Sequence, residues 1–151
     1  MSKRQEKKKL ELGSPEKLRI GIARACFNTD ITQQQLDAAT TVLESYNISY
    51  DVIEVAGCFE ITHALQKMAL TKKYNGLVAL GCLIKGETIH YDVVVQAIST
   101  AIMDLIVKHN TPIGFGIITA NNEKNALERI WLAEDATYAV LQLIQNTKDL
   151  S

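Results

Sequence analysis

The sequence predicts an α/β domain in which a four-stranded parallel sheet lies between two layers of helices. Short apolar runs alternate with longer stretches whose apolar residues recur at helical spacing. The short runs are almost continuously apolar, as strands covered on both faces require. Apolar residues make up 47% of the 151 residues, enough for one substantial core. Because strands that alternate with helices are joined by right-handed crossovers, we expect the strands to be parallel.

The expected elements follow the order βαβαβαβα and form a flavodoxin-like three-layer sandwich. The strands are expected at 18–23, 50–55, 76–83 and 112–118. Helices are expected at 32–46, 60–70 and 91–109, and the last helical stretch, about 122–146, is one helix or two. Thr32 and Gln35 fit a capping box at the start of the first helix.

Residues 1–16 are charged and aperiodic and are expected to form a flexible polar tail, followed by a single domain over 17–151. The net charge of −1 gives no indication of a nucleic-acid binder, whose hallmark is a clustered basic surface. A basic arm at 1–16 that touches RNA or membrane is the less favoured alternative to a solvated tail. Three cysteines, an odd number, argue against a disulfide framework and for a reducing compartment. No apolar run approaches the ~20 residues of a membrane span, and the amino terminus is unlike a signal peptide. We therefore expect a cytoplasmic protein.

The loops that follow the strands, at 24–28, 56–60, 82–90 and 118–123, should meet at one edge, where open α/β sheets bind ligands. In the third loop Gly86 allows a tight turn, and a helix begins near Thr88 or His90 with Lys85 close by. Free N–H groups at a helix start attract anions, so this loop is a candidate phosphate cradle. The alternative is an ordinary turn capped by Thr88. His90, at the ligand edge, is a candidate for moving protons at neutral pH.

The other loops carry groups that could contact a flat or hydroxylated ligand. Phe27 and Phe59 could stack on a heterocycle, although one of them could equally belong to the core. Glu60 could accept hydrogen bonds from hydroxyls or interact with the helix dipole. Arg129 could bind phosphate or be solvated. The cysteines lack a close pair, which favours inert buried thiols over a zinc site.

Together, four segments resemble those of the 6,7-dimethyl-8-ribityllumazine synthase family of riboflavin biosynthesis. The segments are FNTDI, AGCFEIT, ALGCLIKGETIHYD and PIGFGIITANNEKNALER, in the family's order and spacing from about residue 18 to 130. The resemblance implies a transferase that condenses 5-amino-6-(D-ribitylamino)uracil with 3,4-dihydroxy-2-butanone 4-phosphate, releasing phosphate and water. It implies no metal and no organic cofactor.

The resemblance also implies roles for individual residues. His90 would be the general acid and base. Gly86, Glu87, Thr88 and Arg129 would hold the butanone phosphate. The remaining substrate-binding residues would contact the pyrimidine ring or the ribityl chain, with one supplied by a neighbouring subunit: Phe27, Asn28, Cys58, Phe59, Glu60, Leu83, Ile84 and, from the neighbour, Phe115. Family members form homopentamers, and some build decamers or icosahedral capsids with sites between subunits.

The chain departs from the family pattern in three places. Ala56 and Thr62 stand where prolines are usual. The segment 128–140 lacks the family's glycine-rich turn and N-K-G lysine, so we expect a straighter helix with Trp131 packed inward. Two alternatives remain: a flavodoxin-like module that binds a flavin or lumazine without making one, and a shell protein with secondary catalysis. Retention of both His90 and Arg129 favours the enzyme.

Overall fold

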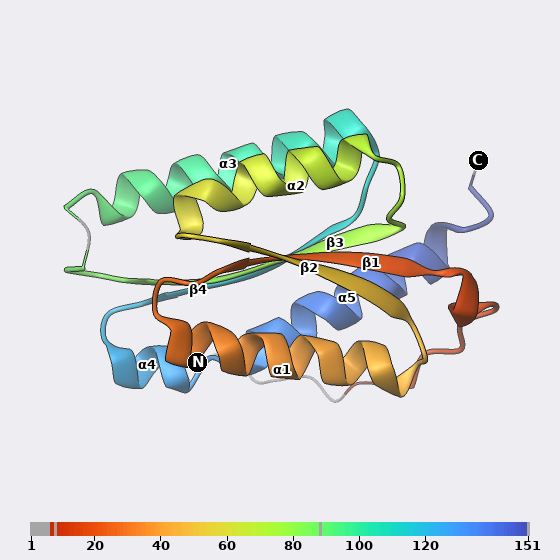
Figure 1. The fold of residues 1–151 in the computed structure, drawn as a ribbon, viewed down its shortest axis with the longest axis horizontal. Helices are drawn as coiled ribbons and strands as arrows, with labels where there is room; N and C mark the ends of the chain where they lie inside the picture. Colours follow the sequence, from red (N-terminus) through yellow and green to blue (C-terminus); the bar gives the residue numbers. More distant parts are fainter. Residues whose placement is uncertain (1–6, 8, 88, 151) are drawn as a thin grey trace.

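The structure, a computed structural model, describes residues 7, 9–87 and 89–150, and its centre is a parallel four-stranded sheet (Figure 1). The strand order is β2-β1-β3-β4. The strands are β1 (Arg19–Ala25), β2 (Ser49–Val55), β3 (Gly76–Ile84) and β4 (Ile113–Ala120). Every pairing is parallel. The predicted fold class is confirmed.

Helices cover both faces of the sheet (Figure 1). One face carries α2 (Ile61–Leu70) and α3 (Tyr91–His109), and the other carries α1 (Thr29–Ser45), α4 (Glu123–Leu127) and α5 (Trp131–Thr147). Two short 3₁₀ turns, η1 (Pro15–Lys17) and η2 (Cys58–Glu60), precede β1 and α2. The stretch 122–146 is therefore two helices, and α5 runs without interruption from Trp131 to Thr147, as expected for a segment that lacks the family's glycine-rich turn. Trp131 is half-buried at its first position.

Each face of the sheet has its own apolar core. Leu65, Leu77 and Ile102 are fully buried beneath α2 and α3, and Leu43 and Leu141 are fully buried beneath α1 and α5. Burying a side chain of this size contributes about 1.5–3 kcal/mol. A third, smaller cluster lies near the carboxyl ends of the strands and supports the loops there: Ile31, Cys82, Ile84, Ile118, Ala120 and Ala126.

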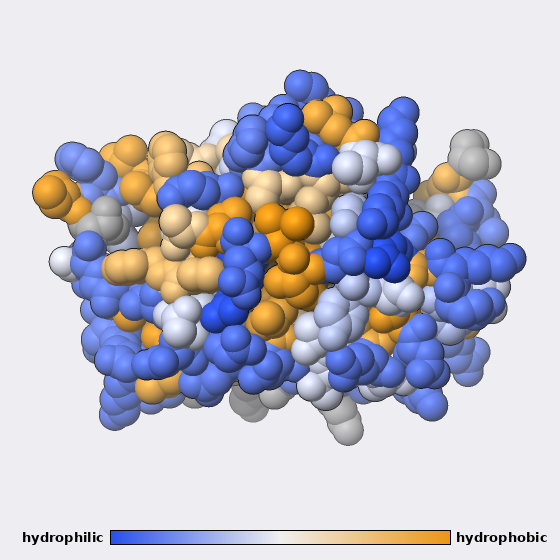
Figure 2. Space-filling view, viewed as in Figure 1, coloured by the Kyte–Doolittle hydropathy of each residue, from blue (hydrophilic) through white to orange (hydrophobic). Residues whose placement is uncertain are grey.

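The outer strand β2 does not match the expectation of strands buried on both faces. It pairs only with β1, and Ile53 is 44% exposed. Figure 2, viewed from the same side as Figure 1, shows apolar residues gathered near the middle of the molecular surface on that side. An edge strand has a neighbour on one side only, so an apolar sequence there does not guarantee burial.

The predicted capping box at Thr32 and Gln35 is wrong, because α1 begins earlier, at Thr29. Thr32 and Gln35 are fully buried within the helix. The Gln35 Nε2 donates to the Gly116 carbonyl at 2.6 Å. The residue at the N-cap position is Asn28, whose backbone is left-handed with φ of 61°. These two polar side chains therefore bind groups of the sheet and do not cap the helix.

The described part of the expected tail, residues 7 and 9–16, lies against the domain. Leu10 and Leu12 pack on the core beneath α1 and α5. The Leu10 N–H donates to the Tyr46 hydroxyl at 2.9 Å, and the Lys7 ammonium lies over the Tyr138 ring. These contacts join the described part of the segment to α1 and α5. Across the described residues, the search for a membrane-spanning helix, one sufficiently long and apolar, finds none.

Candidate active site

Backbone hydrogen bonds join the loops at the carboxyl edge of the sheet in pairs. The Cys26 N–H donates to the Val55 carbonyl at 2.8 Å, and the Phe27 N–H donates to the Ala56 carbonyl at 2.9 Å. The Lys85 N–H donates to the Ala120 carbonyl at 2.8 Å. The structure thus brings the loop after β1 beside the loop after β2, and the loop after β3 beside the loop after β4.

Asn28 connects the two pairs of loops. Its side-chain Nδ2 donates to the Cys82 carbonyl at 3.3 Å and to the Glu87 carboxylate at 3.1 Å. A hollow of about 360 Å³ lies beside this bridge, lined by Asn28, Ile84 and Glu87 together with residues of α1 and Glu123. All four loops therefore contribute to one continuous rim.

Two aromatic side chains on this rim are open to solvent. Phe27 is 57% exposed and Phe59 is 72% exposed, so neither belongs to the core. Glu60 is exposed and directly precedes α2. Rings and a carboxylate presented in this way can stack on a flat heterocycle and accept hydrogen bonds from hydroxyls.

Cys58 differs from its neighbours because its side chain points into the core. It is 5% exposed, and burial raises the pKa of its thiol to about 12. Burial likewise raises the pKa of the Cys82 thiol to about 11. Both cysteines are therefore neutral thiols near pH 7. Because the Cys58 side chain is buried, a ligand at the rim could meet Cys58 only through its main chain. Leu83 is partly exposed, whereas Ile84 is 6% exposed.

The loop after β3 makes a tight turn at Gly86, whose φ is +95°. The Glu87 N–H donates to the Ile84 carbonyl at 3.1 Å and is therefore used within the turn. Thr88, the other predicted phosphate ligand of this turn, lies outside the described residues. His90 occupies the N-cap position of α3 and is exposed. A hollow of about 390 Å³ is lined by Lys85, Gly86, His90 and the first residues of α3.

Arg129 and Phe115 lie on the side of the sheet formed by β4. Arg129 follows α4 and is exposed, and its Nη1 donates to the Thr119 carbonyl. Phe115 is 42% exposed and lies on the outer strand β4, where it pairs with Ala79 of β3. Ala120, the last residue of β4, lies five positions further along the strand, which is about 16 Å at ~3.3 Å per residue. The structure does not bring Phe115 to the rim of its own chain.

Sequence reasoning missed one charged group near the rim. Arg24 is 5% exposed and donates to the Glu54 carboxylate at 3.2 Å. The signal was present, because Arg24 stands between Ala23 and Ala25 at the end of the apolar run that begins at Ile20. Among the described residues, no group of three or more His, Cys, Asp and Glu side chains could hold a metal ion.

The sequence is similar to proteins of known activity along most of its length. Residues 17–148 match the family described as 6,7-dimethyl-8-ribityllumazine synthase. Relatives of that name include one from Limosilactobacillus reuteri, 40% identical over 114 residues and 75% of each chain. Another, from Lactiplantibacillus plantarum, is 41% identical over 115 residues, 74% of this chain and 72% of the relative. A third, from Afipia carboxidovorans, is 36% identical over 143 residues and 88% of each chain.

Proposed function

We propose, from the premise that this chain belongs to the 6,7-dimethyl-8-ribityllumazine synthase family, that its rim of loops is the active site. The chain is a transferase of riboflavin biosynthesis. The reaction joins 5-amino-6-(D-ribitylamino)uracil to 3,4-dihydroxy-2-butanone 4-phosphate and releases phosphate and water. We propose that it needs no metal and no organic cofactor, because the chemistry consists of condensation, elimination and proton transfer.

His90 is the proposed general acid and base. Imine formation between an amine and a ketone, loss of phosphate and ring closure each require a proton to move. The exposed imidazole beside a hollow at the start of α3 supports this role, since imidazole is suited to proton transfer near neutral pH.

The phosphate of the butanone substrate is proposed to bind between the Gly86 turn and Arg129. Lys85 lines the same hollow as His90, and the amino terminus of the long helix α3 favours an anion there. Arg129 donates one N–H to Thr119 and can offer its other nitrogens to a phosphate. Because the Glu87 N–H is already bonded to Ile84, we assign Glu87 a weaker part in phosphate binding than Gly86 and Thr88.

The uracil substrate is proposed to lie across the first two loops. The exposed ring of Phe27 offers a stacking surface, and Phe59, Asn28 and Glu60 border the ribityl chain. Leu83 and Ile84 flank the ring, and Cys58 contributes through its main chain. Holding two substrates side by side can contribute about 7–11 kcal/mol to lowering a barrier.

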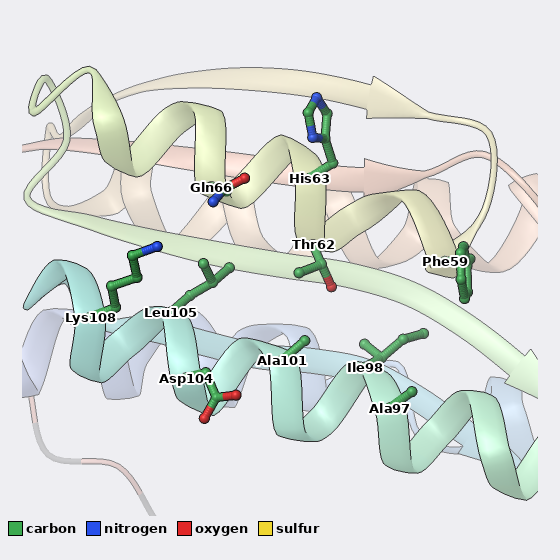
Figure 3. A pocket seen from close by; sticks show the side chains of 10 residues that line it. All are labelled: Phe59, Thr62, His63, Gln66, Ala97, Ile98, Ala101, Asp104, Leu105 and Lys108. Atoms are coloured by element: carbon green, nitrogen blue, oxygen red, sulfur yellow. The ribbon is translucent and has the colours of Figure 1, made fainter.

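A second copy of the chain is proposed to complete each site, in a homopentamer or a pentamer-based assembly. The position of Phe115, far from its own rim and partly exposed, supports a role in a neighbouring site. A groove of about 560 Å³ lies between α2 and α3. Figure 3 shows side chains that line it, among them Ala97, Ala101 and Leu105. Small side chains let a neighbouring helix approach closely. A head-to-tail contact forms a ring where the rotation between neighbouring copies closes, and a homopentamer requires that closure.

The proposed setting is the cytoplasm, in keeping with three free cysteines. The main alternative is a carrier that binds a flavin or lumazine without making one, which the exposed Phe27 and Phe59 would also suit. The exposed His90 at the hollow is the observation that favours the enzyme, because a carrier has no need of a proton-transfer group.

Mixing the two substrates with the protein and following lumazine absorbance and fluorescence tests the proposal, together with the native particle mass. We expect turnover, and His90→Ala should lower kcat by about 100-fold or more. His109→Ala, at the other end of the same helix, is the control and should retain turnover. Arg129→Ala should raise the KM for the phosphorylated substrate. Wild-type activity in His90→Ala would reject the acid and base assignment, and lumazine binding without turnover would favour the carrier.

A further inference from the structure

We propose that Arg24 is a positioning residue that holds the Phe27–Asn28 loop in the geometry needed to bind the uracil substrate. The inference rests on the proposed active site and assigns this buried arginine a part in it.

Arg24 is placed where stability alone would disfavour it. It is 5% exposed, and it is the one charged side chain among the buried residues of the described chain. Its ionic partner, the Glu54 side chain, is 58% exposed, so the pair lies only partly in the interior. The guanidinium also lies at the amino-terminal turn of α1, where the helix dipole disfavours a cation. Burying a charged group costs free energy unless the group is paired and its hydrogen bonds have good geometry.

The guanidinium joins three segments of the chain. Its Nε donates to the Thr32 hydroxyl at 3.3 Å, and its Nη2 donates to the Thr29 hydroxyl at 3.4 Å and to the Thr29 carbonyl at 3.5 Å. Its Nη1 donates to Glu54 at 3.2 Å. Thr29 and Thr32 belong to the first turn of α1, and Glu54 lies at the end of β2. Arg24 therefore holds the beginning of α1 against the ends of β1 and β2.

The segment between these anchors is the first substrate-binding loop. Only Cys26, Phe27 and Asn28 separate the end of β1 from the start of α1. The Cys26 thiol donates to the other oxygen of the Glu54 carboxylate at 3.6 Å. Asn28 adopts a left-handed backbone conformation, which asparagine adopts more readily than most residues other than glycine.

By holding the start of α1, Arg24 therefore orients two side chains of the loop, Phe27 and Asn28. Asn28 reaches across to Cys82 and Glu87, and the exposed Phe27 ring stands beside it. If the first turn of α1 shifts, both groups shift with it. A displacement of about 1 Å in a binding loop can cost up to about 100-fold in rate.

Arg24→Met, which keeps the length of the side chain and removes its hydrogen bonds, tests the proposal. We expect kcat/KM to fall by about 10- to 100-fold, mainly through a higher KM for the uracil substrate. The KM for the butanone phosphate should change by less than about threefold. Arg24→Lys, which can keep part of the bonding, should restore part of the affinity. Arg19→Met removes the arginine at the opposite end of β1, whose partner is Asp51, and should leave both KM values unchanged.

A double-mutant cycle with Thr32→Val tests whether Arg24 acts through α1. If it does, the effects of Arg24→Met and Thr32→Val on the uracil KM should be less than additive. Should Arg24→Met fail to fold, Arg24→Lys and Thr32→Val alone must each raise that KM. Variants that melt earlier but keep the wild-type KM would show a purely structural arginine and overturn the proposal. Failure of wild-type turnover would instead count against the proposed function, and calorimetric binding of the uracil substrate would then still test Arg24.

Discussion

Gly114→Ala should be among the most destabilising single-methyl changes in the protein, because α5 crosses β4 at this residue. A Cβ added at Gly114 would lie 2.4 Å from the carbonyl oxygen of Ala136 and 2.9 Å from its carbonyl carbon. Both atoms belong to the helix backbone, so no side-chain rotation can relieve the contact. Restoring a normal separation of about 3.5 Å requires the helix and the strand to move apart by roughly 1 Å.

That movement would loosen the packing of Ala136 and Val140, which are 7% and 2% exposed. Overpacking a well-packed core costs about 1–3 kcal/mol, and the backbone clash places this variant near the upper end. For a chain of this size, about 3 kcal/mol corresponds to a fall in Tm of about 6–12 °C. Thermal unfolding followed by circular dichroism measures it.

Gly57→Ala is the matched control. Its backbone is extended, with φ of −147°, and the nearest atom to an added Cβ is the Glu60 carboxylate at 3.9 Å. We expect its stability to change by less than about 0.5 kcal/mol. If Gly114→Ala unfolded at the same temperature as Gly57→Ala, the close approach of α5 to β4 would be wrong.

Two further predictions concern ionisable side chains. The pKa of Asp51 lies well below its usual value of 3.8, mainly because Arg19 donates a hydrogen bond to its carboxylate. The Tyr74 hydroxyl and Lys73 lower the pKa of Asp51 further. The contribution of Asp51 to stability is therefore fully present above pH 3.8 and is lost as the pH falls toward the lowered pKa. Urea unfolding of wild type and Asp51→Asn should converge on acidification; curves that stay equally far apart would contradict this reasoning. Since burial raises the pKa of Cys58 to about 12 and that of Cys82 to about 11, iodoacetamide at pH 8 should modify the folded protein at the half-buried Cys26 alone. Mass spectrometry showing two or more adducts before unfolding would refute it.

The spacing of apolar residues predicted the bounds of the long helix α3 well. The bounds of α3, 91–109, were predicted from apolar spacing and are those observed, because a long amphipathic helix on one face of a sheet repeats the same environment at every turn. The start of α1 was predicted poorly. Thr32 and Gln35 have the residue types of a cap, but their hydrogen-bond partners are Arg24 and Gly116 on strands of the sheet.

The candidate site was predictable as a set of loops but not as a geometry. The rule that parallel strands end at one edge predicts that the loops carrying Phe27, Glu60 and His90 lie at the same edge. It could not show that Asn28 bridges to Glu87, or that the Glu87 N–H is used within its own turn. Those facts depend on side-chain directions, which differ between neighbouring residues of one loop.

By itself, the sequence determined the order of strands and helices, the parallel sheet, the family and the loops in which we propose the active site, because hydrophobic period and residue type are local properties. Only the tertiary structure decided which polar groups would meet. Arg24 and Thr32 form a buried contact only after β1 and α1 have packed together, and Phe115 is separated from its own rim by the register of β4 against β3. Such contacts depend on how whole elements pack, and no short segment of the chain contains that information.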